Sequence, residues 1–219
     1  MTTPLTLNIH VVFLAITMEV TSTSKPIHVK KMNSIKDRDF NIVLLGQGGV
    51  GKSALLVRFS TGKFIYEYSP TLEFNCEMTE VIDEEAADMK IFDTANTNEP
   101  HVYHNEYQGF LVVYSITDRM SFETAKQLVK LIREVKKMKA PGGLTCVGLV
   151  GNKVDLTHDR IVSHQEASDF AIEHECLFHE SSALSNTNVK QVFHAVVLQM
   201  RKCRNCKKKD KKGKNFFSR

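Results

Sequence analysis

The chain contains a glycine-rich octapeptide, GQGGVGKS at residues 46–53, whose residue types and spacing suit the binding of a polyphosphate. It matches the pattern GxxxxGK(S/T), in which glycines let successive backbone N–H groups curl around phosphate oxygens. Lys52 would reach the outer phosphates, Ser53 would offer its hydroxyl to Mg²⁺, and the following helix would add its N-terminal dipole. A chance glycine-rich turn is the alternative, which the lysine and serine at the required offset disfavour. The predicted nucleotide-binding residues of this segment are Gly48, Gly49, Val50, Gly51, Lys52, Ser53 and Ala54.

A second motif, NKVD at residues 152–155, would select the base. An ionised Asp155 only accepts hydrogen bonds, so it can take two from the ring N–H and the exocyclic amine of guanine. Adenine offers no such pair and would leave the carboxylate unpaired, which predicts discrimination against ATP on the order of 10⁴-fold. By itself NKVD could be a polar turn, but the phosphate loop upstream favours the base-binding interpretation. The motif also opposes a P-loop nucleotide kinase.

With three further motifs, the chain resembles the small GTPases of the Ras superfamily and, within it, the Ras branch. The resemblance covers about residues 40–201. YSPTLE at 68–73 looks like the first switch, DTA at 93–95 resembles the start of the second, and ESSA at 180–183 is similar to the guanine-closing loop. The resemblance implies a GTP/GDP-binding switch with Mg²⁺, whose loops are ordered by the γ-phosphate and released after hydrolysis.

The resemblance also implies roles for individual residues. Asn152 would support the phosphate loop, Phe64 would pack on the guanine edge, and Ala183 would offer its backbone N–H to the guanine oxygen. The implied metal ligands are Ser53, Thr71 and Asp93, the last through water. The implied catalytic residues are Lys52, Thr71 and Thr97. Further implied nucleotide contacts are Tyr68, Thr71, Asn96, Lys153, Asp155, Ser182 and Leu184.

The second switch departs from the family pattern. Where the family normally reads DTAGQE, this chain reads DTANTN, so Asn96 replaces a glycine and Thr97 replaces the glutamine that orients attacking water. Threonine is shorter and β-branched, so we expect weak intrinsic hydrolysis. A pseudo-GTPase scaffold that holds guanine nucleotide without significant turnover is the alternative. The altered switch and the absence of a terminal prenylation box are similar to the Ras-related estrogen-regulated growth inhibitor and Ras-like branches.

Short apolar runs alternate with helical stretches from residue 40 onward, which is typical of β-α-β units around a mostly parallel sheet. Parallel strands are predicted at Phe40–Leu45, Ala87–Phe92, Phe110–Ile116, Cys146–Val150 and Leu177–Glu180. Asn75–Ile82 is followed by a turn too short for a crossover, so it should be an antiparallel edge strand. Helices are predicted at Lys52–Ser60, Phe122–Met138, His164–His174 and Val189–Lys202, with capping boxes at Ser163 with Glu166 and at Asn188 with Gln191. The predicted fold is an α/β P-loop NTPase with a six-stranded sheet and helices on both faces.

The length of 219 residues and an apolar share of 42% suit one domain with a sizeable core. We expect an N-terminal extension over 1–38, disordered and without the features of a signal peptide, a GTPase domain over 39–202, and a polybasic tail over 203–219. An odd count of five cysteines indicates a reducing, cytoplasmic compartment. Translation from Met32 instead of Met1 remains open.

The net charge of +4 is unevenly distributed, because residues 201–219 carry ten Lys and Arg against one acid, leaving 19 against 24 elsewhere. Such a run is either a solvated tail or a patch that attaches to an anionic membrane, here the inner face of the plasma membrane. Cys203 and Cys206 are either palmitoylation sites or plain thiols. Expected protein partners are effectors and regulators that contact 66–75 and 93–107. We expect a monomer that binds no nucleic acid beyond a mononucleotide.

Overall fold

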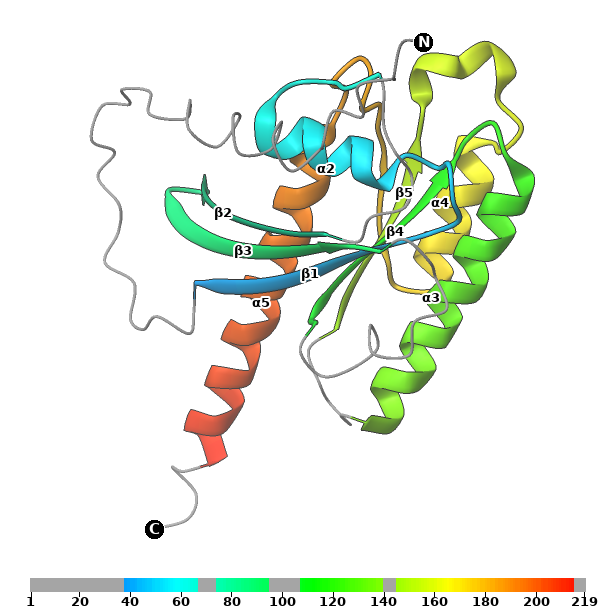
Figure 1. The fold of residues 1–219 in the computed structure, drawn as a ribbon. Coiled ribbons are helices and arrows are strands. Elements are labelled where there is room, and N and C mark those ends of the chain that lie inside the picture. The colour runs from blue at the N-terminus through cyan, green and yellow to red at the C-terminus, as the bar shows by residue number, and fades with distance from the viewer. Residues whose placement is uncertain (1–37, 67–73, 95–106, 140–144, 215–219) are drawn as a thin grey trace, which may run out of the picture.

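A computed structural model describes residues 38–66, 74–94, 107–139 and 145–214 of the chain (Figure 1). The predicted N-terminal extension lies outside this range up to residue 37, together with the alternative start at Met32. The two switch segments also fall largely outside it, so Tyr68, Thr71, Asn96 and Thr97 are not among the described residues.

Six strands form one sheet in the order β2-β3-β1-β4-β5-β6. Every neighbouring pair is parallel except β2 and β3, which are antiparallel. This confirms the predicted mostly parallel sheet with one antiparallel edge strand. The strands are β1 (Asp39–Leu45), β2 (Phe74–Ile82), β3 (Glu85–Asp93), β4 (Gly109–Ser115), β5 (Cys146–Asn152) and β6 (Leu177–Glu180).

The turn between β2 and β3 is tighter than the sequence indicated. It consists of Asp83 and Glu84, whose φ angles of 53° and 61° both lie in the left-handed region. Two such residues in succession match the twist of a two-residue hairpin, and aspartate is among the residues tolerated there. Strand β3 therefore begins at Glu85, two residues before the predicted start at Ala87.

Helices cover both faces of the sheet, as predicted. Figure 1 shows α2 and α5 on one side and α3 and α4 on the other. The helices are α2 (Lys52–Thr61), α3 (Arg119–Lys139), α4 (His164–Glu173) and α5 (Val189–Lys214), with a 3-10 helix η3 at Val154–Asp159. Strand β1 sends Ile42 and Leu44 into the core beneath α2 and α5, and Val43 and Leu45 into the core beneath α3. Burial on both faces explains the unbroken apolar run of this strand.

The start of one helix differs from its prediction. Helix α3 begins at Arg119 instead of Phe122, because the Asp118 carboxylate accepts hydrogen bonds from the backbone N–H groups of Met120 and Ser121 at 2.9 and 3.2 Å. The cap of α4 was predicted correctly, since the Ser163 hydroxyl accepts from the Glu166 N–H at 3.1 Å. At α5, which begins at Val189 as predicted, the Asn188 amide donates to the Glu180 carbonyl, 2.9 Å away.

Helix α5 continues to Lys214, twelve residues past its predicted end at Lys202. Arg201 donates to the carbonyls of Ile82, Glu85 and Ala86 at 2.6–3.2 Å, which fastens the helix to the β2–β3 turn. Arg204 donates to the Asp39 carbonyl at 2.6 Å and to the Gln108 side chain at 2.8 Å. Its guanidinium lies 4.5 Å from the centroid of the Phe40 ring. Two arginines that the sequence assigned to a basic terminal segment are thus bound to the domain.

None of the helices in residues 38–66, 107–139 and 145–214 is both long and apolar enough to cross a membrane.

These contacts predict that the folded domain extends past residue 202. A chain that ends at residue 202 loses the Arg204 hydrogen bonds, its contact with Phe40 and the packing of Cys203. We expect it to be about 1–2 kcal/mol less stable to urea than the full chain, at fixed nucleotide concentration. A chain that ends at residue 206 should match the full chain within about 0.5 kcal/mol. Equal stability of the two shortened chains would contradict the prediction.

Candidate functional site

The segments that the sequence singled out leave the sheet at one edge. Strand β1 ends at Leu45 before the glycine loop, β3 ends at Asp93, β5 ends at Asn152 and β6 ends at Glu180. Because β1, β3, β5 and β6 all run in the same direction, their carboxyl ends lie at the same edge of the sheet. This is the edge at which open α/β sheets bind ligands.

The glycine loop has a conformation that other residues could not adopt at two positions. Gly46 has φ 141°, and a Cβ there would lie 2.1 Å from the Val113 carbonyl oxygen. Gly51 has φ 96°, and a Cβ there would lie 2.4 Å from Nδ2 of Asn152. Gly51 precedes the first turn of α2 without a side-chain cap, so the helix N-terminus is open to an anion.

Lys52 lies within this loop. It is 6% exposed, and its ammonium donates to the carbonyls of Gly46 and Gln47 at 2.8 and 3.2 Å. Burial lowers the pKa of Lys52, and the nearby Asp93 carboxylate opposes that shift. The ammonium has three donors, so it can hold the loop closed and still bind a phosphate oxygen.

Ser53 and Asp93 bring two oxygen donors together beside the lysine. The Ser53 hydroxyl hydrogen-bonds to Oδ2 of Asp93, whose side chain is 1% exposed. Thr94 follows immediately, and its hydroxyl donates to the Leu44 carbonyl at 2.8 Å, which ties the end of β3 to β1. A hydroxyl and a carboxylate are hard oxygen ligands of the kind that Mg²⁺ prefers next to phosphates.

Asn152 joins the base motif to the phosphate loop. Its side chain is 2% exposed, and its amide donates to the Val50 carbonyl at 2.8 Å. Lys153 follows with φ 70°, which turns the chain sharply from β5 into η3. Asp155 lies in the first turn of η3, exposed to solvent, and accepts a 2.5 Å hydrogen bond from the Ser182 hydroxyl on one carboxylate oxygen.

The ESSA segment folds into a tight loop against the base motif. Ser182 pairs with Thr187 across the loop, with backbone hydrogen bonds of 3.0 Å in both directions. Ala183 is buried, and Leu184 is exposed. Arg58, on α2, donates to the carbonyls of both residues at 2.8 and 2.5 Å. Sequence reasoning missed this role of Arg58, because no local pattern links a residue in α2 to a loop 125 positions away.

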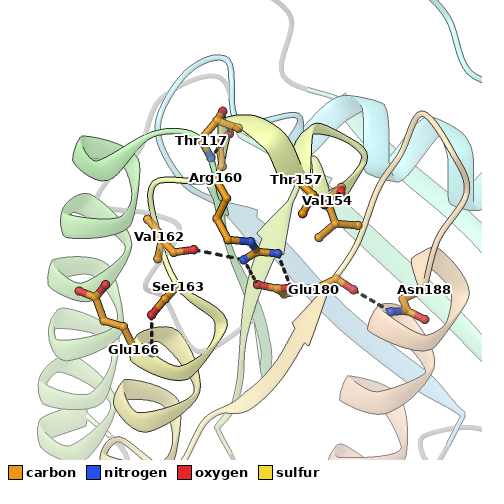
Figure 2. A network of polar contacts seen from close by, with 10 residues as sticks. Thr117, Val154, Thr157, Arg160, Val162, Ser163, Glu166, Glu180 and Asn188 are labelled. Carbon is orange, nitrogen blue, oxygen red and sulfur yellow. Dashed lines mark hydrogen bonds and ion pairs between the residues drawn. The ribbon is translucent and has the colours of Figure 1, made fainter.

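A second arginine missed by sequence reasoning clamps the base-binding segments (Figure 2). Arg160 follows η3 and donates to the two carboxylate oxygens of Glu180 at 2.6 and 2.9 Å, and to the Val162 carbonyl at 3.1 Å. The Arg160 side chain is 23% exposed and the Glu180 side chain 14%. The hydrogen bonds to Glu180 raise the pKa of Arg160. Asn188 holds the Glu180 carbonyl from the other side. This clamp joins the segments that carry Asp155 and Ser182.

Two other residues that were predicted to contact the nucleotide, Ala54 and Phe64, lie in the described part of the chain. Ala54 lies in the first turn of α2 and packs against the core. Phe64 is half-buried after α2 and meets the ring of Tyr66 edge-on, with 5.0 Å between centroids. The structure thus brings together the loop, metal-side and base-side residues; Tyr68, Thr71, Asn96 and Thr97 lie outside the described residues.

Comparison with known proteins agrees with this geometry. The model of the Ras family matches residues 41–202. The chain belongs to the Ras family. It is 41% identical over 175 residues to the human Ras-related and estrogen-regulated growth inhibitor, covering 77% of this chain and 85% of that protein. It is 39% identical over 169 residues to the GTP-binding protein Rit1 of Mus musculus, covering 75% of each. It is 36% identical over 184 residues to Ras-like protein 2 of Mucor circinelloides f. lusitanicus, covering 80% of this chain and 91% of that protein.

Ras-family membership makes this chain a small GTPase, a GTP-binding signalling protein. Family members bind GTP and GDP, typically with Mg²⁺. The side chains described above fit both the nucleotide and the ion. Lys52 and the open N-terminus of α2 suit the phosphates, and the Ser53 and Asp93 oxygens suit the ion. Mg²⁺ bound there would neutralise negative charge on the phosphates.

The clamp between Arg160 and Glu180 predicts an effect on nucleotide retention. We expect Arg160→Ala to release a fluorescent GDP analogue about tenfold faster than wild type, because the loops that carry Asp155 and Ser182 lose their shared anchor. Stopped-flow displacement by excess GDP measures this rate.

Arg119→Ala is the matched control. Arg119 makes an equally short ion pair, 2.5 Å to Glu166, but this pair joins α3 to α4. Its loss should leave GDP release within about twofold of wild type. If the two variants released GDP equally fast, the clamp would have no specific role in the site.

Proposed function

We propose that this Ras-family chain is a GTP/GDP-dependent signalling switch with weak intrinsic GTP hydrolysis. The observation that carries the proposal is that residues 93–97 keep the family pattern in their first part and depart from it in their second. Asp93 and Thr94 are buried and fixed at the end of β3 by Ser53 and Leu44. The sequence then continues with Asn96 and Thr97, where the family pattern has glycine and glutamine.

Binding is supported by the residues that hold phosphate and base. Lys52 can stabilise charge that develops on the transferred phosphoryl group, because it is already buried beside the loop and needs little reorganisation. The carboxylate of Asp155 is fixed by Ser182 on one oxygen and can accept hydrogen bonds from guanine. None of these contacts depends on the identity of residues 96 and 97.

Turnover requires a water placed in line with the γ-phosphate. A glutamine amide can donate to and accept from such a water at some distance from the backbone, whereas the threonine hydroxyl is carried on the Cβ atom. Asn96 keeps a backbone N–H for the γ-phosphate, and asparagine tolerates positive φ better than most residues. The substitutions therefore favour retained GTP contact with slow cleavage.

The same substitutions support a second candidate, a pseudo-GTPase that holds guanine nucleotide and serves as a scaffold. The two candidates differ in one measurable quantity, the rate of a single turnover. A switch must convert bound GTP to GDP, however slowly, whereas a scaffold of this kind has no need to do so.

Single-turnover hydrolysis of GTP preloaded on the protein tests the proposal. We expect wild type to hydrolyse GTP more slowly than an ordinary Ras protein measured beside it. Thr97→Gln should raise the rate at least about tenfold, because the amide can reach the water.

Thr97→Ser is the control, since its hydroxyl lies equally close to the backbone and the rate should stay near that of wild type. Hydrolysis by wild type as fast as by ordinary Ras would overturn the assignment of slow turnover. Retention of unhydrolysed GTP by both wild type and Thr97→Gln would favour the scaffold.

Protein partners are proposed to contact residues 66–75 and 93–107. The described parts of these segments include Tyr66, which is 83% exposed, and Asp93, which is buried beside Ser53. An exposed aromatic ring beside a nucleotide-dependent loop suits a protein contact. A movement of Asp93 would be passed on to a partner that contacts residues 93–107.

We also propose that the basic terminal segment attaches the protein to an anionic membrane at the cytoplasmic face. Arg201 and Arg204 are bound to the domain, so the proposal rests on the other basic residues of 201–219. Juxtamembrane basic residues contribute about 1 kcal/mol each on anionic lipid. Cys206 is exposed, as an acyl acceptor must be.

Cosedimentation with vesicles of phosphatidylcholine and phosphatidylserine tests this attachment. Lys208→Glu with Lys209→Glu should lower binding at least about tenfold, because each reversal replaces an attraction with a repulsion. Lys63→Glu with Lys130→Glu, at two exposed positions of the globular body, should bind like wild type. Equal losses in both pairs would indicate a response to net charge alone.

A further inference from the structure

Two cysteine side chains meet at the edge of the sheet opposite the nucleotide site. Sγ of Cys146 lies 4.0 Å from Sγ of Cys203, although the residues are 57 positions apart in the chain. Cys146 is the first residue of β5 and is 3% exposed, while Cys203 lies on α5 and is half-buried. The sulfurs need to approach by roughly 2 Å to reach the ~2.05 Å length of a disulfide bond.

The environment distinguishes the two thiols. Burial and the neighbouring Cys203 raise the pKa of Cys146 to about 12, while Arg133 and Arg204 act in the opposite direction. Arg204 is held there by the Asp39 carbonyl and by the Phe40 ring, so a positive charge stays beside the pair. Cys203 is the half-buried member of the pair, so it is the one that solvent can reach.

We propose that Cys146 and Cys203 form a reversible disulfide when the protein meets a peroxide, and that this bond fastens α5 to the start of β5. The Cys203 thiol attacks a peroxide oxygen, which gives a sulfenic acid and releases one water from hydrogen peroxide. The Cys146 thiol then attacks the sulfenic sulfur, forms the S–S bond and releases a second water. The two thiols lose two electrons and two protons, and one hydrogen peroxide becomes two waters.

The bond would stabilise the domain without closing the nucleotide site. Strand β5 begins at Cys146 and reaches the base motif only at its other end, Asn152. A crosslink across 57 positions restricts the unfolded chain strongly, and it removes fraying of α5 at the point where Arg204 holds it. Cys203 then cannot carry an acyl chain, whereas the exposed Cys206 can. In a reducing compartment such a pair responds to oxidants and is not permanently bonded.

The test uses the full-length chain with GDP bound, treated with hydrogen peroxide and then blocked with an alkylating agent. Peptide mapping without reduction should give one linked pair, Cys146 with Cys203, and free thiols should fall from five to three. The melting temperature should rise by about 5–10 °C and return to its starting value with dithiothreitol. The rate of GDP release should stay within about twofold of the reduced protein.

Three variants decide the assignment. Cys206→Ser should keep both the linked peptide and the rise in melting temperature. Cys203→Ser, at a half-buried position that tolerates a small polar side chain, should lose both, and Cys146→Ala should do the same. A peptide that joins Cys203 to Cys206, a crosslink between two chains that disappears in Cys206→Ser, or no loss of thiols would each overturn the proposal.

Discussion

The site depends on a buried hydrogen bond that joins the phosphate loop to the base motif, from the Asn152 amide to the Val50 carbonyl. This bond is possible only because Gly51 has no Cβ, since that atom would lie 2.4 Å from the same amide nitrogen. A buried amide that lost this partner would bear its full desolvation cost, so loop and base motif keep one relative position. The distance between phosphate-binding and base-binding groups is therefore set before any nucleotide arrives.

The packing of the parallel sheet fixes the positions of the site residues at its strand ends. Four strands end at functional segments, and both faces of β1 and β5 are buried beneath helices. Side chains at the strand ends, such as Asp93 and Asn152, inherit the rigidity of the core and stay buried themselves. The positions of these two side chains are therefore set by the packing of the sheet.

The sequence predicts most of this fold, because strand and helix periodicities and the two nucleotide motifs are local patterns. It also identified residues that the structure brings together, such as Lys52, Ser53 and Asp93. It could not identify Arg58 or Arg160, because their partners are backbone carbonyls and a carboxylate on other elements. The helix end at Lys202 was wrong for the same reason. A lysine-rich run looks like a solvated tail until Arg204 is seen to bind the Asp39 carbonyl.

The proposed slow hydrolysis would separate nucleotide binding from turnover within one protein. Groups that contact nucleotide equally in the ground state and the transition state determine affinity, whereas a group that positions the attacking water acts only on the barrier. Asp155, proposed to be a group of the first kind, is held in place by the Ser182 hydroxyl. The proposed groups of the second kind are residues 96 and 97, which follow the end of β3 at Asp93. Substitutions at these two positions can therefore slow cleavage while leaving intact the contacts that retain the nucleotide.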